Sequence, residues 1–206
     1  MPIFRISGKT ILFLHIPKAG GTSVEEFLAQ HSGESFRMTL NTERLPCVPQ
    51  HFHGEMIEKL FAPDFFDYAF SVTRNPYARI LSEYNYRMQH RHKPYRWFPV
   101  PSFETWLKTT LGRYRRDPYV YSNHIRPQIA FRIAGSRSFR LEDQIGNLMS
   151  ELAEETGVDA PPALPHANRS TKRATAMTEA AAQLIQDFYA MDFETFGYSR
   201  DSFRDL

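Results

Sequence analysis

Residues 11–28 read ILFLHIPKAGGTSVEEFL, and this stretch predicts how the chain folds. Its first four residues, 11–14, form a continuous apolar run, which is typical of a strand buried on both faces. Pro17 ends that strand, and Gly20 and Gly21 allow the backbone to turn tightly. The apolar residues that follow recur at helical spacing. The stretch therefore predicts a strand, a glycine-rich turn and a helix.

The start of this helix is suited to binding an anion. We expect Thr22 or Ser23 to cap it. Free backbone N–H groups and the helix dipole converge where a tight turn enters a helix, and Lys18 adds a full positive charge there. The Walker A loop places its lysine after the last glycine, whereas Lys18 precedes Gly20 and Gly21, so this is a different motif. A solvent-facing turn with an idle lysine is the alternative.

A second cationic site follows another predicted strand. Residues 68–73 (YAFSVT) are rich in strand-forming side chains, and Arg74 comes directly after them. Asn75 is a good helix cap and Pro76 a good first helical residue. Ser82 lies a little over two helical turns beyond Arg74, so these two side chains could hold one anion together. A capped helix without a ligand is the alternative.

The remaining pattern predicts the outer parts of one domain. Residues 3–6 fit a short edge strand, and helices are expected over residues 141–156 and 178–191, where apolar side chains fall on one face. Strand–turn–helix units favour a parallel sheet covered on both faces. A length of 206 residues suits a single domain, residues 1–206.

Both anion-site motifs resemble those of sulfotransferases that use 3′-phosphoadenosine 5′-phosphosulfate (PAPS). Residues 17–23 resemble the 5′-phosphosulfate loop of the carbohydrate branch, the heparan/chondroitin-type or sulfotransferase family 2-like group. Residues 72–84 resemble the 3′-phosphate motif of the same enzymes. Looser similarities occur at residues 125–128, 164–170 and 189–198. The resemblance implies an α/β, P-loop-like three-layer fold with a central parallel sheet flanked by helices.

The resemblance also implies the reaction and its donor. A sulfuryl group would pass from PAPS to a hydroxyl of an acceptor, with a carbohydrate expected. Lys18 and nearby N–H groups would stabilise the bridging oxygen without a metal, and Arg74 and Ser82 would hold the 3′-phosphate. Arg79 also matches a family arginine, with an ion pair to Glu83 as the alternative. The expected donor-binding residues are Pro17, Lys18, Ala19, Gly20, Gly21, Thr22, Ser23, Arg74, Ser82, His166 and Asn168.

The acceptor hydroxyl needs a base, and the candidates beside Lys18 as catalytic residues are His51, His53 and Glu55. A His-Gly-His element stands there in the uronyl branch of the family. His53-Gly54-Glu55 fits its register with a glutamate in the second place, and His51 with His53 fits it shifted. Each of the three has a plain loop or surface role as its alternative. His51 and His53 lack a third ligand at suitable spacing, so we expect no zinc.

The composition limits the kinds of partner and the cellular location that we expect. A formal net charge of +2 leaves no overall polyanion footprint, so we expect no nucleic acid. Cys47 is the single cysteine, which excludes an internal disulfide and fits a reducing compartment. No apolar run approaches the roughly 20 residues of a membrane span, and a cytoplasmic location is expected. Basic and aromatic residues at 87–97 suit an anionic or sugar-containing acceptor, with a solvated loop as the alternative.

Two other functions compete with this hypothesis. The first is a P-loop-like nucleotide kinase or NTPase, which the position of Lys18 and the lack of a clear Mg²⁺-binding aspartate disfavour. The second is a non-catalytic module that binds a nucleotide or a polyanion on the same scaffold. The sequence predicts neither the identity of the acceptor nor the oligomeric state.

Overall fold

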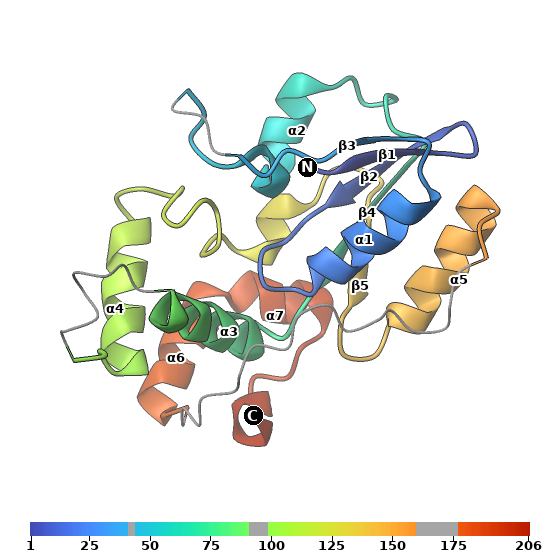
Figure 1. The fold of residues 1–206 in the computed structure, drawn as a ribbon. Helices are drawn as coiled ribbons and strands as arrows, with labels where there is room; N and C mark the ends of the chain where they lie inside the picture. Colours follow the sequence, from blue (N-terminus) through green and yellow to red (C-terminus); the bar gives the residue numbers. More distant parts are fainter. Residues whose placement is uncertain (41–43, 91–98, 160–176) are drawn as a thin grey trace.

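The structure, a computed structural model, describes residues 1–40, 44–90, 99–159 and 177–206 (Figure 1). His166 and Asn168 lie outside the described residues, as does most of the basic and aromatic segment at 87–97. The strands are β1 (Ile3–Ile6), β2 (Lys9–Leu14), β3 (Glu34–Phe36), β4 (Tyr68–Thr73) and β5 (Arg137–Arg140). The helices are α1 (Gly21–His31), α2 (Gly54–Leu60), α3 (Pro76–Gln89), α4 (Phe103–Tyr114), α5 (Ile145–Thr156), α6 (Glu179–Phe188) and α7 (Ala190–Phe196). Single 3-10 turns are η1 (Pro49–His51), η3 (Gln128–Phe131) and η4 (Ser202–Asp205).

The five strands form one mixed sheet in the order β3-β1-β2-β4-β5. Strands β2, β4 and β5 run parallel, as predicted, whereas β1 is antiparallel to both β2 and β3. The wholly parallel sheet is therefore confirmed only for its β2–β4–β5 half. Ser7 and Gly8 join β1 to β2 with φ angles of 50° and 82°, and a two-residue turn of this kind forces an antiparallel pair.

Alternating side chains of β2 separate the two covered faces of the sheet. Ile11 and Phe13 pack with apolar residues of α1 and α5. Leu12 and Leu14 point the other way, into a cluster with Ile57 of α2. Figure 1 shows α1 and α5 on one side of the strands and α2 on the other. The molecule therefore has the expected three layers, helices on both faces of a sheet.

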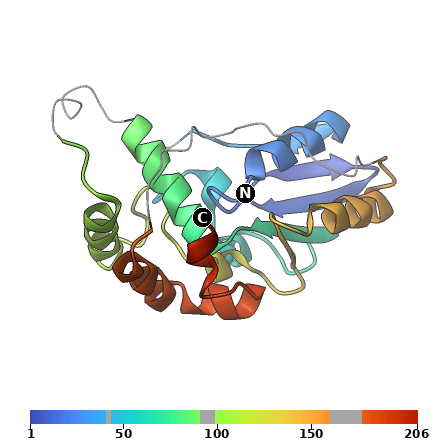
Figure 2. The same cartoon turned by 90° about the horizontal axis from the view of Figure 1, so that it is seen from below.

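Helices α3, α4, α6 and α7 form a second apolar cluster beside the sheet (Figure 2). Helix α3 starts where predicted, because Asn75 Oδ1 accepts a hydrogen bond from Tyr77 N at 3.0 Å and Pro76 opens the first turn. The single helix predicted over residues 178–191 is instead two, α6 and α7, which meet at Tyr189. The Tyr189 hydroxyl donates to Ile125 O at 2.7 Å, which fixes this junction.

Two further differences from the sequence prediction concern the sheet edges. The predicted edge strand, β1, lies inside the sheet because β3 pairs along its outer side. The sequence pattern did not predict β5, in which Phe139 is the single buried side chain. Among the helices of the described ranges, none combines the length and apolar character needed to cross a membrane.

Candidate active site

The predicted anion loop lies between β2 and α1, and its turn depends on two residues with left-handed backbone. Lys18 has φ 67° and Gly20 has φ 81°. Gly20 is the residue that caps α1, and no side chain accepts a hydrogen bond there. The predicted cap at Thr22 or Ser23 is therefore wrong, because the helix begins at Gly21 and takes both residues into its first turn. The first N–H groups of α1 thus have no side-chain cap, as an anion site requires.

Gly21 is required by a close contact with His15. A Cβ atom at Gly21 would lie 2.7 Å from His15 Nε2. The imidazole cannot move away easily, because its Nδ1 is bonded to the buried carboxylate of Glu25, which also accepts from Gln50 Nε2 at 2.7 Å. His15 therefore supports the loop from below.

Lys18 lies among other charged groups. Its Nζ is 4.4 Å from the ring centre of Tyr86 on α3, a cation–π distance. Burial lowers the pKa of Lys18; the Glu83 carboxylate opposes that shift, while Arg74 and Arg87 add to it. The Lys18 amine thus belongs to a locally cationic site in a chain whose net charge is only +2.

Arg74 lies directly beside the Lys18 loop. Its Nη1 donates to Lys18 O at 3.2 Å, so the two predicted anion sites meet. The Gln128 side chain brackets the Arg74 backbone: Oε1 accepts from Arg74 N at 2.9 Å and Nε2 donates to Arg74 O at 2.8 Å. Gln128 is held in turn by Asp192, which accepts from its backbone N at 2.8 Å. The position of Arg74 is therefore set by residues far along the chain.

Arg79 has a different role from the ion pair with Glu83 that was its alternative. Its guanidinium is fully buried; Nε donates to Pro17 O at 3.0 Å, and Nη2 donates to His124 O at 2.9 Å and to Arg126 O at 3.0 Å. Glu83 pairs with other partners. Arg79 therefore ties the anion loop, α3 and the segment around His124 into one unit.

The predicted donor residues are brought together to different degrees. Residues 17–23 form the β2–α1 loop and first helical turn, and Arg74 touches that loop. Ser82 is buried on α3, four residues before Tyr86, so the two residues share one face of that helix.

Two of the predicted base candidates lie on α2 and its cap. Glu55 is exposed and accepts from Lys59 Nζ at 2.5 Å. His53 is buried, and burial lowers its pKa to about 4. Its ring lies 5.9 Å from that of Tyr119, and Asn123 Nδ2 is 3.4 Å from its Nδ1. None of these contacts is with the Lys18 loop.

The glycine of the His53-Gly54-Glu55 element has a packing role. A Cβ atom at Gly54 would lie 2.1 Å from Arg132 O, the backbone that follows η3. Only glycine fits this contact between α2 and η3. The glycine that makes this element resemble a catalytic motif is therefore also required for packing.

His51 belongs to a row of three histidine rings. Its ring centre is 5.5 Å from that of His15 and 4.8 Å from that of His124. His51 Nδ1 donates to Ser122 O at 3.1 Å, and burial lowers its pKa to about 2. Of the three base candidates, His51 is thus the one in contact with residues that surround the anion loop.

A carboxylate–histidine pair that the sequence pattern missed stands beside this row. Glu83 Oε2 accepts from His124 Nδ1 at 2.7 Å, and Glu83 Oε1 accepts from Arg87 Nε at 2.6 Å. No spacing rule links residues 83 and 124. The available signal was the similarity at residues 125–128, which begins one residue after His124. In the part of the chain that the structure describes, no three His, Cys, Asp or Glu side chains are grouped to hold a metal ion.

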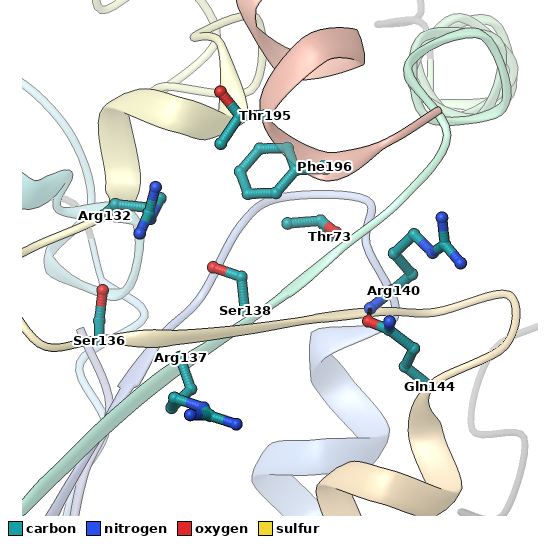
Figure 3. A pocket seen from close by; sticks show the side chains of 9 residues that line it. All are labelled: Thr73, Arg132, Ser136, Arg137, Ser138, Arg140, Gln144, Thr195 and Phe196. Atoms are coloured by element: carbon teal, nitrogen blue, oxygen red, sulfur yellow. Dashed lines mark hydrogen bonds between the residues drawn. The ribbon is translucent and has the colours of Figure 1, made fainter. Parts of the chain in front are cut away.

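A cavity of about 340 Å³ lies elsewhere, between β5, the end of η3 and α7 (Figure 3). It is lined by Thr73, Arg132, Ser136, Arg137, Ser138, Arg140, Gln144, Thr195 and Phe196. None of the predicted donor or base residues lines it. Arg137 and Arg140 are already paired, with Glu151 and Asp143.

The fold and site define an α/β protein with a cationic loop between a parallel strand and a helix. The sequence profile of the sulfotransferase family matches residues 2–199, so the chain belongs to the sulfotransferase family. This confirms the resemblance to sulfotransferase family 2 drawn from the two motifs and identifies the chain as a sulfotransferase. No curated protein sequence matches the chain.

Proposed function

We propose that this protein transfers a sulfuryl group from PAPS to a hydroxyl group of a carbohydrate, with residues 1–206 acting as one domain. Membership of the sulfotransferase family supports the reaction class. One observation supports the donor above all: Arg74 Nη1 donates to Lys18 O at 3.2 Å. The cationic groups that follow β2 and β4 are therefore within reach of one nucleotide that carries phosphate groups on both the 3′ and the 5′ oxygen of its ribose.

Each donor residue has a proposed task. Lys18 and the N–H groups of residues 20–23 bind the 5′-phosphosulfate, because the uncapped start of α1 and the amine attract the same anion. Pro17 and Ala19 shape this loop. Arg74 and Ser82 hold the 3′-phosphate. His166 and Asn168, outside the described residues, are proposed to close over the nucleotide.

The chemistry follows from this placement. A bond forms between the acceptor oxygen and sulfur, and the bond from sulfur to the bridging oxygen breaks, leaving its electron pair on the 5′-phosphate of adenosine 3′,5′-bisphosphate (PAP). Lys18 stabilises the charge that develops on that oxygen, so the proposal needs no metal. The proton of the acceptor passes to a base, for which His51, His53 and Glu55 are the sequence candidates.

An anionic glycan is the proposed acceptor. Arg87, half-buried at the end of α3, stacks its guanidinium 4.1 Å from the ring centre of Tyr121 and 5.6 Å from that of Tyr86. A guanidinium backed by aromatic rings suits a sugar that carries carboxylate or sulfate groups. These groups lie around Lys18, where the acceptor must approach.

Calorimetry with PAP tests the donor site. The wild-type protein should bind one PAP per chain, and Arg74→Ala should weaken binding about 100-fold because a charge-assisted hydrogen-bond partner of the phosphate is lost. Arg137→Ala is the matched control, since that exposed arginine on β5 pairs with Glu151. No binding by the wild type would end the proposal.

Transfer assays distinguish the competing functions. With ³⁵S-labelled PAPS and a panel of desulfated glycans, the proposal expects labelled glycan. Tight PAP binding without transfer to any member would favour a binding module. Turnover of ATP that depends on magnesium would favour an NTPase.

A further inference from the structure

Glu83 is a buried carboxylate with two cationic or titratable partners. Its side chain is 0% exposed, and it accepts from Arg87 Nε at 2.6 Å and from His124 Nδ1 at 2.7 Å. These partners outweigh the effect of burial and lower the pKa of Glu83 to about 2. The carboxylate is therefore ionised at neutral pH.

The bond to Glu83 fixes which nitrogen of His124 is basic. Because a carboxylate only accepts, Nδ1 of His124 must carry the proton, and Nε2 is left as the atom that can take one. The backbone is equally fixed. Arg79 Nη2 donates to His124 O at 2.9 Å, while Arg79 Nε donates to Pro17 O at 3.0 Å. His124 is thus held by the same buried guanidinium that holds the donor loop.

One aromatic ring connects His124 with Lys18. Tyr86 stacks on the His124 imidazole with ring centres 6.5 Å apart, and Lys18 Nζ lies 4.4 Å from the centre of the same tyrosine ring. The imidazole and the amine therefore border one region of the surface. In the proposed reaction the Lys18 amine lies at the leaving oxygen. The base has to lie on the opposite side of the sulfuryl group, next to the acceptor hydroxyl.

We propose that His124, oriented by Glu83, is the base that accepts the proton of the acceptor hydroxyl; this inference rests on the proposed function. As the acceptor oxygen bonds to sulfur, its proton moves to His124 Nε2, and the electron pair of the broken bond stays on the 5′-phosphate of PAP. His124 is then a catalytic residue and Glu83 a positioning residue.

The other histidines of the row fit this role less well. His15 also has a carboxylate partner, but its Nε2 packs against Gly21 beneath the loop. His51 has a backbone carbonyl in place of a carboxylate at Nδ1. Of these rings, His124 combines a buried carboxylate with contact to the ring under Lys18.

Burial is the main reason that the pKa of His124 is lowered, which favours the neutral imidazole before the reaction. Glu83 opposes this lowering of the pKa, and Arg87 and Lys18 add to it. The groups that face it are Glu83, Tyr86 and Arg87 of α3, Lys18 of the loop, and His51 of η1. A neutral imidazole with a carboxylate at its back is the form that accepts a proton.

The first test removes Nε2 and keeps a nitrogen donor near the position of Nδ1. In His124→Asn the amide nitrogen can still donate to Glu83, so the buried carboxylate keeps its partner. Transfer from ³⁵S-labelled PAPS to desulfated chondroitin and desulfated heparin should fall at least about 100-fold, the usual effect of losing a general base. PAP affinity by calorimetry should stay within about threefold, since no contact proposed for the donor is removed. His31→Asn, on the last turn of α1, is the matched control and should retain full transfer.

The second test separates a positioning role from a structural one. Glu83→Gln removes the charge that raises the pKa of His124. The acid limb of the kcat/KM profile should then move to lower pH, and the maximal rate should fall because the base is weaker. The ¹⁵N shifts of the His124 imidazole should report the same change without any acceptor. Unmoved acid limb and imidazole shifts would contradict the assignment of Glu83.

The outcomes separate this inference from the proposed function. If wild type fails to bind PAP, the proposed function fails. If His124→Asn keeps its transfer rate while a substitution at His51, His53 or Glu55 abolishes transfer, the proposed function stands and the assignment of His124 is overturned. If wild type binds PAP but transfers to no glycan, the binding-module alternative holds and His124 is not a base.

Discussion

The donor loop and the base region are held in different ways. The loop at residues 15–21 is shaped by its own backbone, with left-handed turns at Lys18 and Gly20 and a glycine pressed against His15. The base region is assembled by side chains from distant segments, as in the bond between Glu83 and His124. In the proposed function, recognition of the phosphates is thus encoded within short motifs, whereas proton transfer depends on how α3 meets the loop before η3.

A single buried side chain is hydrogen-bonded to both regions. Arg79 donates to Pro17 O of the loop and to His124 O of the base region. Damage to either region alone should leave the other working, while loss of Arg79 should affect both. Four predictions test this division, beginning with the largest expected effect.

Lys18→Ala should affect the reaction far more than donor binding. We expect transfer to fall about 1,000-fold, on the order of 4 kcal/mol, because a preorganised cation at the leaving oxygen is lost. PAP affinity should fall only about tenfold, since Arg74 and the helix N–H groups remain. Labelled-sulfate transfer and calorimetry measure the two, with Lys108→Ala on α4 as control. Equal losses in both would mean that Lys18 only binds.

Arg79→Met should weaken both regions together. The carbonyls of Pro17, His124 and Arg126 would lose their buried donor, so we expect the free energy of unfolding to fall by about 3 kcal/mol. Urea unfolding measures this, with Arg137→Met as the exposed control. A change under about 1 kcal/mol, or a loss of transfer with PAP affinity intact, would show that the two regions are not tied through Arg79.

Gly21→Ala should distort the donor loop alone. The new Cβ would lie 2.7 Å from His15 Nε2, and we expect a loss of about 2 kcal/mol in stability with weaker PAP binding. Gly112→Ala, in open space within α4, is the control and should stabilise the protein by about 0.5–1 kcal/mol. If Gly21→Ala were as well tolerated as the control, the contact with His15 would carry no weight.

The prediction with the smallest effect at neutral pH concerns His51, and its effect grows as the pH falls. Burial lowers the pKa of His51 from 6.5 to about 2 in the folded protein. Between these two pH values the unfolded chain therefore binds a proton at His51 that the folded protein does not bind. Stability present above pH 6.5 should be lost as pH falls from there towards 2, by up to about 1.4 kcal/mol per pH unit from this group. In His51→Gln the slope of unfolding free energy against pH should be shallower. If the substitution left this slope unchanged, the His51 side chain would be exposed to solvent in the folded protein, contrary to this account.

The sequence predicts the secondary structure around the proposed donor site well, for a physical reason. Glycine, proline and cap residues act through local backbone geometry, so the strand over residues 68–73 and the start of α3 at Pro76 are confirmed. The sequence prediction is wrong where more than one residue could cap the same helix. Gly20 replaces Thr22 or Ser23 as the cap because the turn becomes left-handed before the helix begins.

The rest of the molecule depends on contacts that no spacing rule contains. Strand β5 is short and mostly polar, and it exists because it pairs with β4. Tyr189 divides a helical pattern because its hydroxyl reaches Ile125 O. In the sequence, Glu83 and His124 look like ordinary helix and loop residues. Only the fold brings His124 Nδ1 to 2.7 Å from Glu83 Oε2.

The most direct measurement of the central claim is a calorimetric cycle of two ligands and two proteins. PAP and adenosine 5′-phosphate differ by the 3′-phosphate alone, and wild type and Arg74→Ala differ by its proposed partner. We expect wild type to prefer PAP by about 100-fold and Arg74→Ala to lose most of that preference. If Arg74→Ala keeps the wild-type preference, or if wild type has none, Lys18 and Arg74 do not bind the 5′ and 3′ phosphate groups of one nucleotide.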